Sequence, residues 1–228
     1  MKIFLLVALF GLTLTAQTPK LTPHYSVSEV PKHISVKEKK ARYFALLVPP
    51  VEKVYKELYS EYERVQVDLN DTNKSQEIAA LKKSFRVKTD RELLVAMKPH
   101  PVSITLAQGA IESAWGTSRF FREANNVFGM WNSDASSERI AANEKREGKH
   151  TIWLSKYKDL EASVRAYYRT LQKGKTYKKF RELNYETDNV FEIVKGLDKY
   201  SERGEEYTKE LASMIRYNKL TKYDKDKK

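Results

Sequence analysis

The segment Ala107–Trp131 reads AQGAIESAWGTSRFFREANNVFGMW, and its first half has the pattern of a buried helix. Apolar residues recur there at three- and four-residue spacing, which places them on one face of a helix. They are Ile104, Ala107, Ile111, Ala114 and Trp115. The residues between them are small and allow other helices to approach closely. We expect a central helix with Ser103 as its N-cap and Gly116 as its stop signal.

Helical patterns also dominate the rest of the sequence. We expect helices over residues 36–69, 78–87, 89–97, 117–124, 159–174, 188–197 and 205–217. The pair Pro49-Pro50 should end or kink the first of these, because neither proline donates a backbone hydrogen bond. A small β-hairpin that turns near Gly148 is expected within residues 138–157, where apolar and polar residues alternate. VFGMW is a candidate strand.

The composition favours a folded protein with an anionic partner. The chain has 228 residues, 41% of them hydrophobic, and a formal net charge of +12. Such a charge indicates nucleic acid, an acidic membrane surface or an acidic polymer as the partner. The chain has no cysteine, which excludes disulfides, thiol catalysis and lipid attachment at a cysteine.

The N-terminus predicts export. Lys2 precedes the apolar run IFLLVALFGLTL, which is short for a membrane span and is followed by small residues up to Ala16. A permanent membrane anchor is the alternative. Export makes an acidic polymer outside the cytoplasm a better partner than nucleic acid. The expected divisions are a signal peptide (1–16), a linker (17–35), an N-terminal helical region (36–98), a catalytic domain (99–220) and a charged, solvated tail (221–228).

Several catalytic chemistries lack their residues in this sequence. The four histidines are isolated, with no HExxH motif, so we expect them on the surface or in the linker and expect no metal or other cofactor. They are His24, His33, His100 and His150. A GxSxG elbow and a phosphate-binding glycine loop are also missing from the sequence. A carboxylate mechanism remains.

Glu112 is the candidate acid within the central helix. An apolar, aromatic setting raises the pKa of a carboxyl, which keeps it protonated for general acid catalysis of glycoside hydrolysis. Glu112 lies one helical turn from Gln108 and Trp115, near the helix C-terminus. The alternative is an ordinary helical glutamate that pairs with Arg119 or Arg122.

Several motifs together resemble the endo-β-N-acetylglucosaminidase-type domain, glycoside hydrolase family 73. AQGAIESAWGTSRF and ANNVFGMW are similar to the family signature, and Ala114 stands where a glycine is usual. KYKDLEASVRAYYRTL and YSERGEEYTKELASMI resemble later segments of the family. VKEKKARYFALLVPPVEKV resembles the N-terminal region of the Bax-type subgroup. The resemblance covers residues 36–215.

The resemblance implies a mainly helical, lysozyme-like α+β fold, with a small β-hairpin lobe across a glycan-binding cleft. It implies Glu112 as the general acid. A second carboxylate is expected on the hairpin, where Glu138, Glu144 and Glu147 lie. Glu147, which precedes Gly148, matches best.

The resemblance also implies residues that line the cleft. A cleft-facing tyrosine is sought at Tyr200 and Tyr207, and we assign Tyr200 to catalysis and Tyr207 to substrate binding. Core packing is the alternative for both. Further sugar contacts are expected from Asn125, Asn126, Phe128 and Trp131. An asparagine amide both donates and accepts hydrogen bonds, and an indole stacks on a sugar face. The alternatives are turn formation by the asparagines and core packing of the phenylalanine.

The leading hypothesis is therefore an exported peptidoglycan hydrolase that cleaves β-1,4 bonds, of glucosaminidase or lysozyme type. We expect it to act as a monomer on peptidoglycan strands in the periplasm or outside the cell, without a nucleic-acid partner or a permanent membrane anchor. A non-catalytic wall-binding protein is the second hypothesis. A basic nucleic-acid-binding protein is a distant third, because the sequence has no recognised binding motif.

Overall fold

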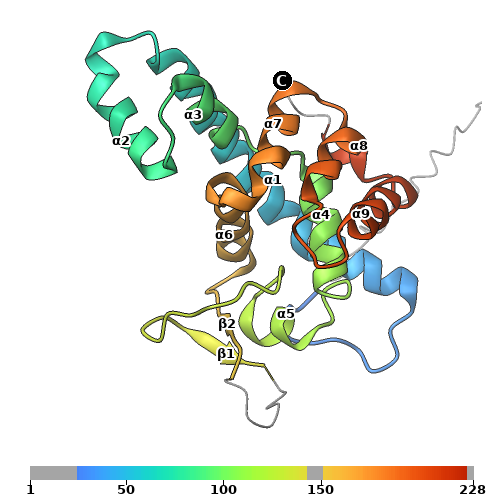
Figure 1. Ribbon diagram of the computed structural model, residues 1–228. Coiled ribbons are helices and arrows are strands. Elements are labelled where there is room, and N and C mark those ends of the chain that lie inside the picture. The colour runs from blue at the N-terminus through green and yellow to red at the C-terminus, as the bar shows by residue number, and fades with distance from the viewer. Residues whose placement is uncertain (1–24, 143–150, 225–228) are drawn as a thin grey trace, which may run out of the picture.

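The computed structural model describes residues 25–142 and 151–224, which form a mainly helical protein with one small antiparallel sheet (Figure 1). The α-helices are α1 (Val36–Asp68), α2 (Ser75–Phe85), α3 (Asp90–Met97), α4 (Val102–Glu112), α5 (Arg119–Ala124), α6 (Leu160–Lys173), α7 (Lys178–Glu186), α8 (Val190–Ile193) and α9 (Glu205–Tyr217). The strands are β1 (Arg139–Ala141) and β2 (Trp153–Ser155). Short 3-10 helices are η1 (Thr72–Lys74), η2 (Lys175–Tyr177), η3 (Val194–Leu197) and η4 (Leu220–Asp224). The expected fold class is confirmed.

The central helix is α4. Every residue from Val102 to Ala110 is buried, and α1, α9 and η4 pack around the helix (Figure 1). The small residues permit this close packing: a Cβ added at Gly109 would lie 2.6 Å from the hydroxyl oxygen of Tyr43. That hydroxyl donates a 2.6 Å hydrogen bond to the carbonyl of Leu106.

Both predicted ends of this helix are wrong. Pro101 is the N-cap, and Ser103 lies inside the first turn, where its amide donates to a carboxylate oxygen of Asp224 at 2.9 Å. At the other end, α4 stops at Glu112 because Ala114, Trp115 and Gly116 have φ angles of 50°, 63° and 70°. This left-handed run takes Ala114 off the predicted buried face and exposes it.

α1 continues through Pro49 and Pro50, so the predicted end there is wrong. An interior proline costs about 3 kcal/mol or more. Burial of one valine or leucine contributes about 1.5–3 kcal/mol, and four such residues of this helix are fully buried: Leu47, Val51, Val54 and Val65. Packing along the helix therefore outweighs the two missing hydrogen bonds.

The expected boundary at residue 98, between the N-terminal helical region and the catalytic domain, would divide a hydrophobic core that is continuous. The main hydrophobic cluster joins residues of α1 to residues of α4, α6, η3 and α9, and a smaller cluster joins the C-terminal half of α1 to α2 and α3. Near the C-terminus, Leu220 is fully buried and η4 packs on α4, while Thr221 and Lys222 are exposed. The domain boundaries themselves stay a prediction.

The hairpin is confirmed as β1 paired antiparallel with β2, in a register that places Ile140 opposite Leu154. The predicted turn near Gly148, with Glu144 and Glu147, lies outside the described residues. VFGMW is not a strand; Trp131 alone forms an isolated bridge with Leu154.

His100 corrects the expectation of surface histidines. It is buried, stacks on Tyr168 with ring centroids 4.3 Å apart, and makes a 3.0 Å hydrogen bond with Thr105 through Nε2. Burial lowers the pKa of its imidazole to about 3, so it is a neutral core side chain. His33 is exposed as expected, whereas His24 and His150 lie outside the described residues.

Among the helices of the described ranges, none combines the length and the apolarity that a membrane span requires.

Candidate active site

The last residue of α4 is Glu112, whose side chain is half-buried where the helix meets the left-handed run. Its Oε1 accepts a 3.0 Å hydrogen bond from the hydroxyl of Tyr207, in the first turns of α9. Burial raises the pKa of the Glu112 carboxyl above its usual value; the hydrogen bond from Tyr207 and the charge of Arg203 offset part of the rise. The carboxyl is therefore biased toward its protonated form.

A chain of hydrogen bonds supports Tyr207 from behind. Gln108, one turn before Glu112 on α4, donates from Nε2 to the Tyr207 hydroxyl oxygen at 2.9 Å. Its Oε1 accepts a hydrogen bond from the hydroxyl of Tyr167 on α6. Tyr167, Gln108 and Tyr207 are each no more than 1% exposed. We call these three residues the tyrosine–glutamine chain.

This chain fixes the direction of the last hydrogen bond. The Tyr207 oxygen already accepts a proton from Gln108, so its own proton is left for Glu112. The reverse arrangement would leave the buried Tyr167 hydroxyl proton without an acceptor, which costs about 1–3 kcal/mol. Tyr207 is therefore a donor to Glu112.

Aromatic rings surround the carboxyl. Tyr200, half-buried, stacks on Tyr207 with ring centroids 5.4 Å apart and an interplanar angle of 14°. Burial raises the pKa of Tyr200, and the charge of Glu112 raises it further. The two tyrosines sought from sequence thus meet beside Glu112. Tyr207, which the sequence analysis assigns to substrate binding, is the one that forms a hydrogen bond with Glu112.

The alternative ion pair of Glu112 is absent from the described structure. Arg119 pairs instead with Glu123 at 3.3 Å and donates to the carbonyl of Ala141 in β1. No ion pair links Glu112 to Arg122 within the described residues. The sequence reasoning also missed Arg203, which pairs with Glu210 at 2.6 Å and lies over the Tyr207 ring.

Both predicted asparagines hold the loop between α5 and the hairpin. Asn126 is 1% exposed; its amide donates to the carbonyls of Met130 at 3.0 Å and Ser155 at 2.8 Å and accepts from the Met130 amide at 2.9 Å. Asn125 has φ 51° and donates to the carbonyl of Tyr157 at 2.9 Å. These contacts match turn formation, the alternative role, and sugar binding by either residue stays a prediction.

Phe128 and Trp131 have opposite environments. Phe128 is 3% exposed and stacks on Tyr167 with ring centroids 3.9 Å apart, so it supports the tyrosine–glutamine chain from the core. Trp131 is 76% exposed at the start of the hairpin lobe. Glu138 is exposed just before β1, while Glu144 and Glu147 lie outside the described residues.

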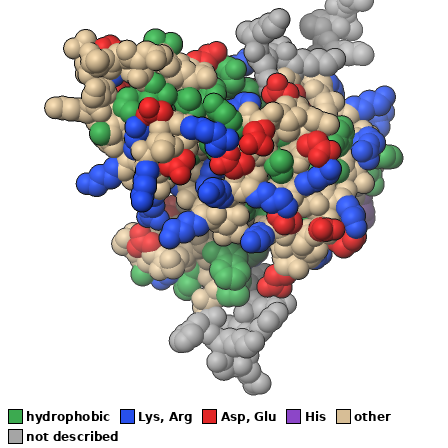
Figure 2. Space-filling model, turned by 45° about the horizontal axis from the view of Figure 1, so that its top comes forward, with side chains coloured by type: hydrophobic (Ala, Val, Ile, Leu, Met, Phe, Trp, Pro, Cys, Tyr) green, Lys and Arg blue, Asp and Glu red, His purple; other side chains and the backbone are tan. Residues whose placement is uncertain are grey.

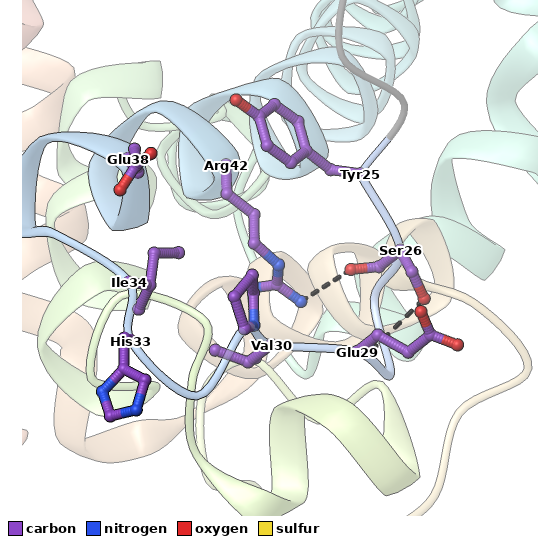
Figure 3. A pocket seen from close by; sticks show the side chains of 9 residues that line it. Tyr25, Ser26, Glu29, Val30, His33, Ile34, Glu38 and Arg42 are labelled. Atoms are coloured by element: carbon purple, nitrogen blue, oxygen red, sulfur yellow. Dashed lines mark hydrogen bonds between the residues drawn. The ribbon is translucent and has the colours of Figure 1, made fainter.

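A cavity of ≈ 570 Å³ lies elsewhere, between residues 25–34 and the first turns of α1 (Figure 3). The buried Arg42 lines it and donates to the carbonyls of Ser26 and Val27, each at 2.7 Å, and of Gly116 at 2.8 Å. Arg42 thus ties the N-terminal segment to the loop that follows Glu112. Both terminal nitrogens of its guanidinium are occupied by these structural contacts, whereas Nε is buried without a hydrogen-bond partner among the described residues.

The described residues supply the parts of an acid catalyst. A carboxyl with a raised pKa, one hydrogen-bond donor at Oε1 and a partly apolar setting are what general acid catalysis requires. No group of three or more His, Asp or Glu residues suited to a metal ion is found within the described ranges.

Residues 91–220 match the model of the glucosaminidase family, described as mannosyl-glycoprotein endo-β-N-acetylglucosaminidase. The sequence matches no curated protein.

Three solved structures illustrate the similarity in fold. The catalytic domain of the autolysin Auto from Listeria monocytogenes is 17% identical, with a TM-score of 0.47, covering 85% of this chain and 100% of that chain. The truncated glycoside hydrolase domain of FlgJ from Salmonella typhimurium is 21% identical, with a TM-score of 0.43, covering 62% and 95%. A peptidoglycan hydrolase from Sphingomonas sp. A1 is 20% identical, with a TM-score of 0.44, covering 58% and 86%. Because the family model spans more than half of the chain, this protein belongs to the glucosaminidase family, glycoside hydrolase family 73, and is a glycoside hydrolase.

Proposed function

We propose that this glycoside hydrolase cleaves the β-1,4-linked glycan of peptidoglycan outside the cytoplasm, with Glu112 as its general acid. The observation that carries the proposal is the half-buried Glu112 carboxyl with a raised pKa, held by Tyr207 at the end of α4. The net charge of +12 suits a polymer that carries carboxylates. Membership of an enzyme family makes the non-catalytic alternative less favoured.

The hydrogen bonds support one position for the reactive proton. Tyr207 occupies Oε1 of Glu112 as a donor, so the carboxyl proton resides on Oε2. Oε2 is then the atom that donates to the glycosidic oxygen. Gln108 and Tyr167 maintain this arrangement because they fix the direction in which Tyr207 donates.

The reaction proceeds by acid-assisted cleavage. Glu112 transfers its proton to the leaving oxygen while the bond from that oxygen to the anomeric carbon breaks. Water then adds its hydroxyl to the anomeric carbon, and a base accepts the remaining proton. For that base we propose a hairpin carboxylate, Glu147 or Glu144. Trp131, exposed on the same lobe, stacks on a sugar ring.

The test is Glu112→Gln assayed on purified peptidoglycan. General acid catalysis is worth about 10²–10⁴-fold in rate, so cleavage should fall by at least that factor. Glutamine retains the shape and can still accept from Tyr207, so thermal unfolding should show an intact fold. Cleavage at the wild-type rate by a folded variant would contradict the proposal.

We also propose that residues 1–16 act as an export signal and that the mature chain begins near Gln17. N-terminal sequencing of protein recovered outside the cytoplasm tests this, and retention of Met1 would contradict it.

A further inference from the structure

The start of α1 and the end of α9 meet through a contact between Lys40 and Asn218; Figure 1 shows where the two helices lie. Nζ of Lys40 lies 4.7 Å from the ring centroid of Trp115 and 5.1 Å from that of Tyr217. The same ammonium donates a 2.7 Å hydrogen bond to Oδ1 of Asn218. Two segments more than 170 residues apart are thus joined at one lysine.

More lysines adjoin this contact. Lys37 lies one turn before Lys40 on α1, and Lys219 follows Asn218. Lys222 lies over the ring of Tyr223, which packs against Phe44, one turn after Lys40. We call this surface the Lys40 face; it consists of Lys37, Lys40, Tyr217, Lys219 and Lys222.

The charge of the Lys40 face is uncompensated within the described residues. None of its four lysines forms an ion pair there, whereas Lys53 pairs with Glu161 at 2.8 Å and Lys209 with Glu206 at 2.7 Å. Elsewhere the surface mixes both signs, and Figure 2 shows Lys and Arg side chains among Asp and Glu. The nearby carboxylate of Glu38 is bound to the backbone amide and hydroxyl of Ser35 at the start of α1.

An exposed ring lies among these cations. Tyr217 is 82% exposed, one of the few large apolar side chains left open to solvent in the described structure. Lys40 covers Tyr217 without burying it. An aromatic face beside ammonium groups suits a sugar that carries an anionic substituent, because the ring stacks on the sugar and the ammonium pairs with the anion.

The Lys40 face begins at the catalytic helix. Trp115, whose ring contacts Lys40, follows Glu112 by three residues and packs against Tyr43 and Phe44 of α1. Glu112 contacts the start of α9 through Tyr207, and Tyr217 at the end of α9 lies about 15 Å further along the helix. A long polymer bound at Glu112 can span that length, whereas a short fragment does not need to reach the lysines.

We propose that the Lys40 face is a second binding site for an anionic glycan polymer, which it holds beside the catalytic site. The proposal rests on the proposed function, because it takes the wall polymer as the ligand. Lysine binds carboxylates of the peptide stems and phosphodiesters of attached polymers alike, as a point charge. The shared chemistry is a polyanion built on sugars.

The experiment measures co-sedimentation with insoluble peptidoglycan, in the Glu112→Gln background so that the polymer is not digested. The test variant is Lys37→Gln/Lys219→Gln/Lys222→Gln, three exposed positions whose change should leave the fold intact. The control variant, Lys83→Gln/Lys88→Gln/Lys175→Gln, removes the same charge from exposed lysines of α2, the α2–α3 loop and η2.

We expect the test variant to bind about tenfold more weakly at low salt, since each exposed ion pair contributes a few-fold in affinity. The control variant should bind like the parent. About 0.5 M salt should remove most of the difference between test variant and parent, because screening acts on exposed charges. Tyr217→Ala should weaken binding at both salt concentrations. Peptidoglycan with and without its attached phosphate polymers identifies which anions are bound.

The proposal would be overturned if the test variant bound peptidoglycan as well as the parent does. It would also be overturned if the test and control variants lost the same amount of binding, because net charge alone would then explain the effect. Tighter binding of a DNA duplex than of peptidoglycan would also overturn it. Cleavage of soluble glycan fragments, measured with Glu112 intact, separates the two proposals. Unchanged cleavage with unchanged wall binding refutes only the Lys40 face, whereas absent cleavage in wild type refutes the proposed function.

Discussion

Removal of one hydroxyl, in Tyr207→Phe, should change both the pH profile of activity and the stability of the protein. The hydrogen bond from Tyr207 lowers the pKa of Glu112 and partly offsets the effect of burial. Without it the pKa rises further. Since a general acid works in its protonated form, the alkaline limb of the activity profile should move to higher pH.

The loss of stability follows from the partner left behind. Nε2 of Gln108 is buried and loses its acceptor, at a cost of about 1–3 kcal/mol. For a chain of this size each kcal/mol lowers Tm by about 2–4 °C. We therefore expect Tm to fall by roughly 2–12 °C, measured by thermal unfolding beside the pH dependence of peptidoglycan cleavage.

A matched variant separates the two effects. Tyr167→Phe/Gln108→Met/Tyr207→Phe removes the whole tyrosine–glutamine chain and leaves no buried partner unpaired, a change that is often nearly neutral for stability. It should regain stability relative to Tyr207→Phe and keep the shifted alkaline limb. A wild-type pH profile in folded Tyr207→Phe would refute the role of Tyr207 as donor. A triple variant less stable than the single one would refute the argument from the unpaired glutamine.

Four further outcomes are expected. The pKa of Glu112 is higher in the folded protein than in the unfolded chain, so between these two pKa values the native state binds more protons. The free energy of unfolding therefore falls as the pH rises through that window. Glu112→Gln should lack this fall when urea unfolding is measured from pH about 4 to 8. Gly109→Ala should destabilise by about 1–3 kcal/mol in the same assay, since its Cβ would lie 2.6 Å from a tyrosine hydroxyl of α1; wild-type stability would contradict this packing. Trp131→Ala should raise KM for glycan and change stability by less than about 0.5 kcal/mol, because the indole is 76% exposed; an unchanged KM would remove it from the binding surface. Glu147→Gln and Glu144→Gln should differ, with a loss of about 10²–10⁴-fold in cleavage rate for whichever is the base; equal, wild-type rates would exclude both.

Much of the fold was predictable where local signals are sufficient. Asp159 caps α6 through a 2.7 Å hydrogen bond to the amide of Ala162, and Gly174 follows the end of the helix, as the sequence indicates. α5 and α9 likewise lie where the spacing of apolar residues places them.

The errors arise where tertiary contacts override local signals. Ser103 has the chemistry of an N-cap, yet the helix begins one residue earlier and Asp224, far away in sequence, binds its amide. The prolines of α1 are tolerated because of long-range packing. α7 was not predicted at all, since only Phe180 and Asn184 of its nine residues are buried and the apolar pattern is weak.

The candidate site was predictable in its centre and less so around it. The apolar and aromatic neighbours of Glu112 make it a candidate, but they also fit an ordinary helical glutamate, and its assignment as the acid comes from the family resemblance. No spacing rule distinguishes Tyr207 from Tyr200 as its hydrogen-bond donor, because the choice depends on how α9 packs against α4. The amide of Asn126 donates to the carbonyl of Ser155 in the hairpin. Because Ser155 is distant in sequence, a local pattern does not predict this structural role of Asn126.

The burial of α4 from Val102 to Ala110 has a consequence for how the parts of the candidate site move. Amides in such a helix exchange with solvent only when most of the molecule opens, so Glu112 ends the least mobile element of the fold. The hairpin lobe has two three-residue strands, and a two-stranded hairpin is marginally stable on its own. If the proposed function holds, adaptation to glycans of different shape falls to the hairpin, while Glu112 keeps its position.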